Sequence, residues 1–251
     1  MCTIFLSWQQ HPQFDLIVAA NRDEYYRRPT TPAHYWQDAP HVFAGRDDIG
    51  RGTWMGVTTN RRFAALTNFR NLDAISDNAP SRGGLTSDFL NSTTSPQDYL
   101  ANIQREDLNH NPYNLLVGDK DTLCYYSNMS KKIIHLEPGI YGLSNGYLDA
   151  PWPKVTEGKK EFIQALNMPS QDELLSILQN KAVAADNLLP KTGVPYVMEK
   201  ALSALFIELA GYGTRCSTII MRNKKETLFT EKSYPLETQV ERLITEMILT
   251  T

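Results

Sequence analysis

The chain begins Met1-Cys2-Thr3-Ile4-Phe5-Leu6, and this opening decides how the rest of the sequence is interpreted. The β-branched and apolar run after Cys2 predicts a first strand over residues 3–8. If Met1 is removed, Cys2 carries a thiol and a free α-amine on one residue. An α-amine has a pKa of about 7.7–8.0, so it can accept the thiol proton near neutral pH. Because a thiolate is the attacking species, the opening stretch predicts a nucleophile with its own base.

Other interpretations of Cys2 stay open. A cysteine at the start of a strand can be a small buried apolar residue. A lipid-modified cysteine requires a basic and apolar signal segment upstream, and only Met1 precedes Cys2. If Met1 is retained, the amine of Cys2 is blocked and the catalytic interpretation fails.

The composition is that of a globular protein with a substantial core, since 41% of the 251 residues are apolar and 21% are charged. The net charge of −3, with no long run of one sign, argues against nucleic acid as a partner. No apolar run is long enough to predict a membrane span. Three widely spaced cysteines and five scattered histidines predict neither a disulfide framework nor a metal site. They are typical of a reducing, cytoplasmic location.

A β-hairpin is predicted at the amino-terminal end, because a second apolar run at residues 16–21 follows the polar segment 9–13. The hairpin returns the end of its second strand to the start of its first. The run Asn21-Arg22-Asp23-Glu24 is therefore expected beside Cys2.

The rest of the chain predicts strands in hairpin series with helices between them. The segment 25–39 is expected to be a long ordered loop that contains Pro29 and Pro32. No linker or repeat divides the chain, so one α+β domain over residues 1–251 is predicted. The predicted strands are 42–46, 53–58, 63–67, 114–117, 122–127, 133–136, 139–145, 216–221 and 227–232, and the predicted helices are 85–91, 96–106, 151–166, 171–179, 199–209 and 238–249.

Polar residues follow or start several of these strands and form an ordered series of motifs. The motifs are NRDE at 21–24, TWMGV at 53–57, ALTN at 65–68, YGLSN at 141–145 and YGTR at 212–215. Over nearly the whole chain, this series resembles the NRDE family, which includes the transport and Golgi organisation protein 2 homologues. The resemblance implies an N-terminal nucleophile hydrolase fold, a four-layer αββα sandwich with two antiparallel sheets between helical layers.

The resemblance also implies an activity. The bile salt hydrolases and penicillin V acylases, which look similar in style, use an N-terminal cysteine to cleave non-peptide amide bonds. By motif, Asn68 and Asn145 match the oxyanion asparagines, and Arg215 matches a late arginine. Arg22 matches the arginine after the second strand, but the spacing there is ambiguous by one residue. Either Asp23 or Glu24 can therefore be the carboxylate that faces the amine.

The chemistry of these residue types agrees with such a site. Neutral amide donors from Asn68 and Asn145 would stabilise an oxyanion. Asp23 would orient the α-ammonium by a charge-assisted hydrogen bond, and Arg22 or Arg215 would lower the thiol pKa. Alternatives are turn asparagines, a plain ion pair and an arginine that caps a strand end. The candidate substrate-binding residues are Asn21, Glu24, Tyr25 and Trp36, of which the two aromatic residues could instead pack within their loop.

A second function from another class stays open, namely a non-catalytic carrier of haem or of a lipid or acyl-CoA. The resemblance implies it, since eukaryotic members of the family are linked to haem mobilisation and lipid metabolism. A cysteine thiolate can ligate haem iron, although no Cys-Pro pair or paired histidines are present. A third interpretation is an enzyme fold that has lost its activity. The expected partner is a small-molecule substrate or a hydrophobic ligand, with no other cofactor.

Overall fold

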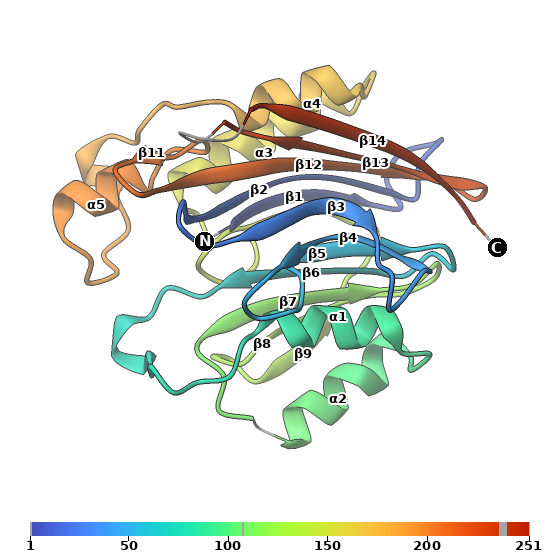
Figure 1. The fold of residues 1–251 in the computed structure, drawn as a ribbon. Coiled ribbons are helices and arrows are strands. Elements are labelled where there is room, and N and C mark those ends of the chain that lie inside the picture. Colours follow the sequence, from blue (N-terminus) through green and yellow to red (C-terminus); the bar gives the residue numbers. More distant parts are fainter. Residues whose placement is uncertain (1, 107, 236–239, 251) are drawn as a thin grey trace.

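Two antiparallel β-sheets lie face to face, and helices cover the outer face of each (Figure 1). The computed structural model describes residues 2–106, 108–235 and 240–250. Within these residues each sheet has seven strands. The layers follow the order helix, sheet, sheet, helix, as predicted for the αββα sandwich.

The first sheet contains both strands of the predicted amino-terminal hairpin at its centre. Its strand order is β10-β1-β2-β12-β13-β14, and the short β11 pairs with β12. These strands are β1 (Cys2–Trp8), β2 (Leu16–Tyr25), β10 (Gly139–Leu143), β11 (Glu208–Leu209), β12 (Tyr212–Arg222), β13 (Glu226–Ser233) and β14 (Arg242–Leu249).

The second sheet is a meander, because each strand pairs with the next one along the chain. Short turns join most of its strands, as the hairpin series in the sequence predicts. Its strands are β3 (Thr30–Tyr35), β4 (Val42–Asp47), β5 (Met55–Thr58), β6 (Phe63–Asn68), β7 (Tyr113–Gly118), β8 (Leu123–Ser127) and β9 (Lys132–His135).

The helices form the two outer layers. Helices α3 (Pro153–Ala165) and α4 (Gln171–Leu178) pack on the first sheet, against β1, β2, β10 and β12. Helices α1 (Gly83–Asn91) and α2 (Pro96–Glu106) pack on the second sheet. The remaining pieces are α5 (Tyr196–Ala201) and the single 3-10 turns η1 (Leu72–Ala74) and η2 (Asp186–Leu188).

The alternation of side chains along β1 builds two separate cores. Ile4 and Leu6 point between the two sheets, whereas Phe5 points outward to the helices and stacks on Phe162 with ring centroids 6.0 Å apart. Because both faces of the strand are covered, apolar residues occupy consecutive positions. The sequence pattern of β1 and β2 follows from this double burial.

The helix predicted over residues 238–249 is wrong, and β14 (Arg242–Leu249) is an edge strand paired with β13. Ile244 and Ile248 face inward while Leu243 and Met247 are exposed. Positions 244 and 248 satisfy both a helical period and an alternating period, so the sequence pattern did not separate the two. The first part of the predicted helix, residues 238–239, lies outside the described residues.

Two further expectations are corrected. The segment 25–39 is not a continuous loop, because β3 (Thr30–Tyr35) pairs with β4 across an irregularity between Thr31 and His34. The helix predicted over 199–209 is also wrong, because α5 (Tyr196–Ala201) ends there and turns lead to β11. Leu202, Leu205 and Phe206 are buried as expected, but they reach the core from those turns.

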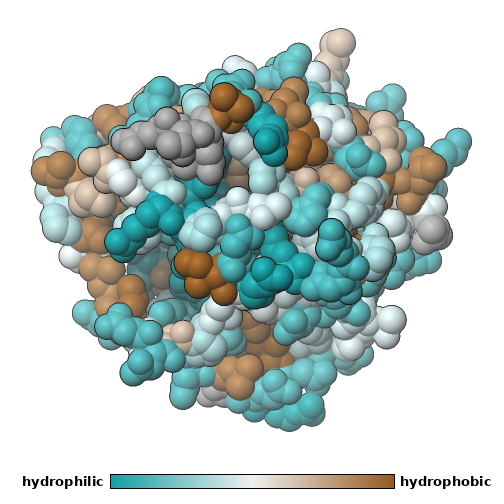
Figure 2. Space-filling view, in the orientation of Figure 1, coloured by the Kyte–Doolittle hydropathy of each residue, from teal (hydrophilic) through white to brown (hydrophobic). Residues whose placement is uncertain are grey.

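None of the helices in the described part of the chain has the length and apolar character that crossing a bilayer would require. On the face drawn in Figure 2, apolar side chains are scattered among hydrophilic ones. Scattered surface apolar residues are normal for a globular protein.

Candidate functional site

One row of paired residues crosses the first sheet at the end where Cys2 lies. Cys2 pairs with Arg22, Arg22 with Cys216, Cys216 with Ser233, and Ser233 with Arg242. Directly paired residues of antiparallel strands point to the same face of a sheet. These five side chains, the Cys2 row, therefore all face the second sheet.

Asn145 extends the Cys2 row on the other side of Cys2. The last residue pair between β1 and β10 is Ile4 with Leu143, and continuing this register two residues beyond β10 places Asn145 opposite Cys2. The Ser144 hydroxyl donates to the Cys2 carbonyl oxygen at 3.2 Å, which holds the two segments together. The structure thus brings the predicted oxyanion residue beside the predicted nucleophile.

The Asn145 side chain is fully buried and fixed. Its Nδ2 donates to the backbone oxygen of Asn68 at 2.9 Å, and its own backbone oxygen accepts from the Arg70 N–H at 2.7 Å. An amide nitrogen has two hydrogens, so one remains for a ligand. Asn68, at the end of β6, is half-buried and lies in this same corner.

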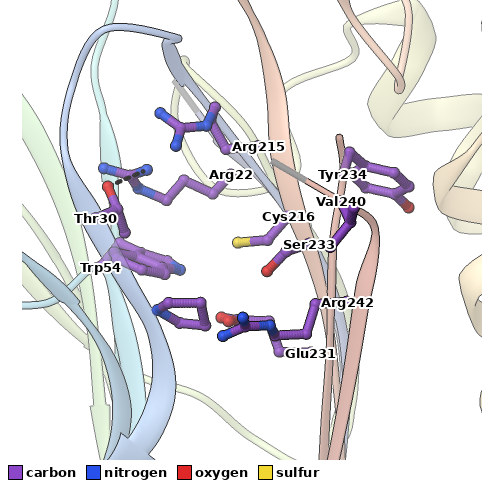
Figure 3. A pocket seen from close by; sticks show the side chains of 11 residues that line it. Arg22, Thr30, Trp54, Arg215, Cys216, Glu231, Ser233, Tyr234, Val240 and Arg242 are labelled. Carbon is purple, nitrogen blue, oxygen red and sulfur yellow. Dashed lines mark hydrogen bonds between the residues drawn. The ribbon is translucent and has the colours of Figure 1, made fainter. Parts of the chain in front are cut away.

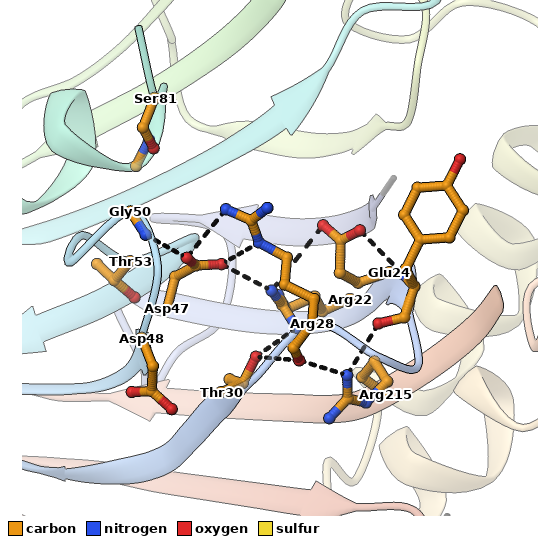
Figure 4. Close-up of polar contacts among 12 residues, drawn as sticks. Arg22, Glu24, Arg28, Thr30, Asp47, Asp48, Gly50, Thr53, Ser81 and Arg215 are labelled. Atoms are coloured by element: carbon orange, nitrogen blue, oxygen red, sulfur yellow. Dashed lines mark hydrogen bonds and ion pairs between the residues drawn. The ribbon is translucent and has the colours of Figure 1, made fainter. Parts of the chain in front are cut away.

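Arg22 is held between the sheets by neighbours from β2, β3 and β4 (Figure 4) and by the Trp54 ring (Figure 3). Its Nη1 donates to Thr30 Oγ1 at 3.3 Å, and its Nη2 lies 3.4 Å from Asp47 Oδ2. Its guanidinium stacks over the Trp54 ring, 4.3 Å from the centroid. A Glu24 carboxylate oxygen is 4.0 Å away, so Arg22 is an ion-paired arginine next to Cys2.

A β-bulge places Arg215 on the same side as Cys216. In the pairing of β2 with β12, Asp23 pairs with Thr214 and Arg22 pairs with Cys216, so Arg215 is the extra residue. Without the bulge, consecutive residues would point to opposite faces. Arg215 Nη1 donates to the carbonyl oxygens of Tyr25, Tyr26 and Arg28 at 2.9–3.2 Å, which anchors the segment after β2.

A buried pair of opposite charges lies on the helix side of the first sheet. Asp23 Oδ1 accepts from the Thr214 hydroxyl at 2.7 Å, and burial raises the pKa of Asp23 against the opposing charge of Lys154. Burial lowers the pKa of Lys154, in α3, to about 8. Its Nζ has no hydrogen-bond partner among the described residues. A lysine with this pKa is poised to exchange a proton near neutral pH.

The Cys2 thiol differs from the sequence prediction in its electrostatics. Burial raises the pKa of Cys2 above its ordinary value of 9.0, and Asp23 adds to the rise while Arg22 opposes it. The predicted lowering by Arg22 is present but smaller than the effect of burial. Burial raises the pKa of Cys216 well above its ordinary value, and Arg22 and, to a smaller extent, Arg215 oppose this rise.

We expect the alkylation of Cys2 to depend steeply on pH in a chain that keeps a residue before it. Because the thiol pKa lies above 9.0, the thiolate fraction should rise about tenfold per pH unit between pH 7 and 9. Iodoacetamide labelling followed by peptide mass analysis measures the rate at each pH. A labelling rate that is high and flat from pH 7 upward would contradict the burial argument.

Three hollows surround the Cys2 row. A void of about 10 Å³, the size of one water, lies directly at Cys2 and is walled by Arg22 and Trp54. The same two residues line a cavity of about 300 Å³, which we call the arginine cavity (Figure 3). A third hollow of about 570 Å³ opens on the Asn145 side. Cys2 thus lies between two spaces large enough for parts of a small molecule.

Three of the predicted substrate-binding residues have no functional group that is free to bind a ligand in these hollows. Asn21 lines the small void, but its amide is used on the helix side, where Nδ2 donates to the backbone oxygens of Leu178 and Leu205 at 2.8 and 3.0 Å. Trp36 is buried between the second sheet and its helices, in the same cluster as Phe89. Tyr25 is 55% exposed and packs edge-on against Tyr212.

Several residues at the site were missed by the sequence analysis. Trp54 takes the place predicted for Trp36, and Gly45 makes room for it, because a Cβ there would overlap the indole ring. Trp54 belongs to the TWMGV motif, which was the available indication. Arg82, at the start of α1, interacts electrostatically with Cys2 and Glu24. In the described part of the chain no three His, Cys, Asp or Glu side chains gather as metal ligands would.

Comparisons with known proteins agree on the fold. A family model described as Transport and Golgi organisation 2 matches residues 1–235. The chain is 35% identical over 257 residues to the Transport and Golgi organization protein 2 homologs of Bos taurus and of Homo sapiens, with 93% of each chain covered. A mutant of conjugated bile acid hydrolase from Clostridium perfringens is similar in structure, with a TM-score of 0.55 and 8% identity over 99% of this chain and 92% of that one. At this identity the likeness shows the fold alone, which is the predicted N-terminal nucleophile hydrolase fold.

Proposed function

The chain belongs to the Transport and Golgi organisation 2 family, and from this premise and the geometry of the site we propose that it is a cysteine amidohydrolase that cleaves a non-peptide amide bond. Cys2 is the nucleophile once Met1 has been removed. The observation that carries the proposal is the Cys2 row. It aligns the thiol with Asn145 on one side and with Arg22 on the other, between two hollows.

The proposed reaction begins when the α-amine of Cys2 takes the thiol proton. The thiolate attacks the amide carbonyl, a C–S bond forms, and the negative charge develops on the carbonyl oxygen. The free N–H of Asn145 Nδ2 stabilises this charge, since its other hydrogen is held by the Asn68 oxygen. The C–N bond then breaks, and the ammonium returns the proton to the leaving amine, which leaves a thioester on Cys2.

Hydrolysis of the thioester completes the cycle. Water gives a proton to the α-amine and attacks the thioester carbonyl, and the acid leaves as the Cys2 thiol is restored. Asp23 is the carboxylate suited to balance the ammonium, because it is buried and lies on the side of Lys154, whereas Glu24 pairs with Arg22. Freeing the amine also places a base at the thiol, which offsets the raised thiol pKa.

The fold neighbour is a hydrolase by its name, but at 8% identity that name supports only the choice of fold. The assignment of a reaction therefore depends on the state of the first residue. The intact mass of protein purified from its native host, before and after brief iodoacetamide treatment, tests this directly. We expect loss of Met1, one fast alkylation at Cys2, and cleavage of at least one member of a broad panel of N-acyl amides.

Two results would count against the hydrolase. Retention of Met1 in the native host would leave the amine of Cys2 blocked. If fully processed protein cleaves no member of the panel, the proposed amidohydrolase activity is excluded even though the amine is free. A chain with an added residue before Cys2 is the matched control, because it keeps the thiol and loses only the free amine.

A non-catalytic carrier of haem or of a lipid or acyl-CoA is the second candidate, and we propose it as the alternative. The raised pKa of the buried Cys2 thiol disfavours the thiolate, which favours a non-catalytic role but not ligation of haem iron, and the cavity beside Cys2 offers space for part of a lipid or acyl chain. The names of the relatives concern transport and Golgi organisation. Titrations with haem and with acyl-CoA test it, and saturable binding that persists in Cys2→Ala without turnover would support a carrier.

A further inference from the structure

The arginine cavity contains positive charge that the described residues do not neutralise. Arg215 lines it and is only 8% exposed, yet no carboxylate of the described residues pairs with it. Its Nη1 makes all three of its hydrogen bonds to carbonyl oxygens. A buried cation without a counter-ion is costly, so the remaining guanidinium donors are left for a ligand.

Arg242 adds a second unpaired cation at the other end of the cavity. It is the last residue of the Cys2 row and has no ion pair among the described residues. In Figure 3, Arg22 and Arg215 lie at one end, and Arg242 and Glu231 lie at the other. The strand spacing makes the row from Cys2 to Arg242 about 19 Å long, so the solvent-exposed Arg242 lies at the end of the row far from Cys2, whereas Arg215 lies beside Arg22.

Glu231 lines the same cavity and forms no ion pair with either arginine in the described structure. It is the carboxylate that lines the cavity, is 1% exposed, and accepts the Ala33 N–H at 2.8 Å through Oε1. Its Oε2 has no hydrogen-bond partner in the described structure. Burial raises the pKa of Glu231, and the Cys216 thiol and Arg22 oppose the rise.

The remaining walls suit a short carbon chain. Trp54 from the second sheet faces Cys216 and Ser233 of the first sheet across the cavity (Figure 3). Pro32 and Val240 add apolar surface. At about 300 Å³, the cavity is at the small end of the range for ligand sites.

We propose that the arginine cavity binds the anionic group of a small molecule, a carboxylate or a phosphate on a short chain, at Arg215. Guanidinium groups are suited to such oxygens because they offer parallel N–H donors. Arg242 adds positive charge from the opposite end of the cavity, toward which the short chain extends past Trp54. The identification of this molecule as the amide substrate rests on the proposed function. The binding of an anion in the cavity does not depend on that function.

Binding is tested by calorimetry on Cys2→Ala protein at low ionic strength, so that no turnover interferes. The probes are adipate, hexyl phosphate and the neutral adipamide. We expect saturable binding of at least one anionic probe, weaker binding of adipamide, and loss of affinity on adding salt. The anion that binds more tightly identifies carboxylate or phosphate as the preferred group.

Arg215→Gln should weaken the binding of the anionic probe about tenfold, because it removes a charged hydrogen-bond donor, and Arg242→Gln should weaken it less, because it removes only positive charge from the far end of the cavity. Arg105→Gln, an exposed arginine of α2, is the matched control and should change nothing. Equal binding of adipamide, binding that neither cavity variant alters, or no binding of either anion would overturn the proposal. If the protein binds an anion but cleaves no amide, the anion site is supported and only the proposed hydrolase activity is excluded.

Discussion

Cys2→Ala should reduce amide turnover by the processed protein at least about 10⁴-fold, because Cys216, the other thiol of the Cys2 row, lies two strands away, has no free α-amine, and has its pKa raised well above the ordinary value by burial. The fold should survive, since alanine fits a buried position at a strand end, and Cys2 makes no side-chain hydrogen bond with the described residues. The measurement is kcat/KM with the best substrate of the panel. Thermal unfolding of the same samples checks the fold.

Cys124→Ser is the matched control for this variant. Cys124 lies in β8 on the helix side of the second sheet, and burial raises its pKa to about 11. It is therefore inert at neutral pH and remote from the Cys2 row. Turnover that persists in Cys2→Ala but falls in Cys124→Ser would mean that the assignment of the nucleophile is wrong.

The arrangement of the site was predictable where it depends on strand topology. The predicted hairpin places Arg22 beside Cys2, and the structure has this pair in register. Asn145 follows two residues after the end of β10, where the same register reaches the level of Cys2. Both placements need only the positions at which apolar runs end, and these are visible in the sequence.

Other features depend on geometry that the sequence pattern does not carry. The bulge at Arg215 changes the face of the sheet to which the side chains at the start of β12 point. A bulge of this kind leaves the apolar run in the sequence unchanged, so the pattern does not reveal it. Trp36 and Trp54 both lie close to short strands, but only Trp54 points between the sheets. Helix and strand patterns coincided at residues 244 and 248, which led to the wrong helix.

The NRDE motif divides its four residues between the two faces of β2. Arg22 and Glu24 face the second sheet and pair with one another. Asn21 and Asp23 face the helices, where Asn21 accepts from the Ser217 hydroxyl at 2.5 Å and holds two backbone oxygens. Because side chains alternate along the strand, the motif contributes to both faces of the sheet. Arg22 and Glu24 place charges on the cavity side, and Asn21 and Asp23 make contacts on the side of the helical layer.

Asn145→Ala should lower kcat about 10²–10³-fold with little change in KM, because it removes one preorganised donor at the oxyanion. The alternative is that Asn145 only ties β6 to the end of β10 through the Asn68 oxygen. Asn114→Ala separates these interpretations. Asn114 Nδ2 donates to the Gly146 oxygen at 2.9 Å and so supports the same segment from β7, without lying in the Cys2 row.

If Asn145 stabilises the oxyanion, Asn145→Ala loses kcat while its unfolding temperature falls no further than that of Asn114→Ala. If Asn145 is only a structural tie, both variants lose stability and activity together, and the split between kcat and KM disappears. The local structure favours the first result. The segment 144–146 keeps other anchors, including the Thr67 hydroxyl on the Ser144 oxygen at 2.7 Å and the Ser144 hydroxyl on the Cys2 oxygen. With those anchors in place, the main loss on removing the Asn145 amide is the N–H that we propose as the oxyanion donor.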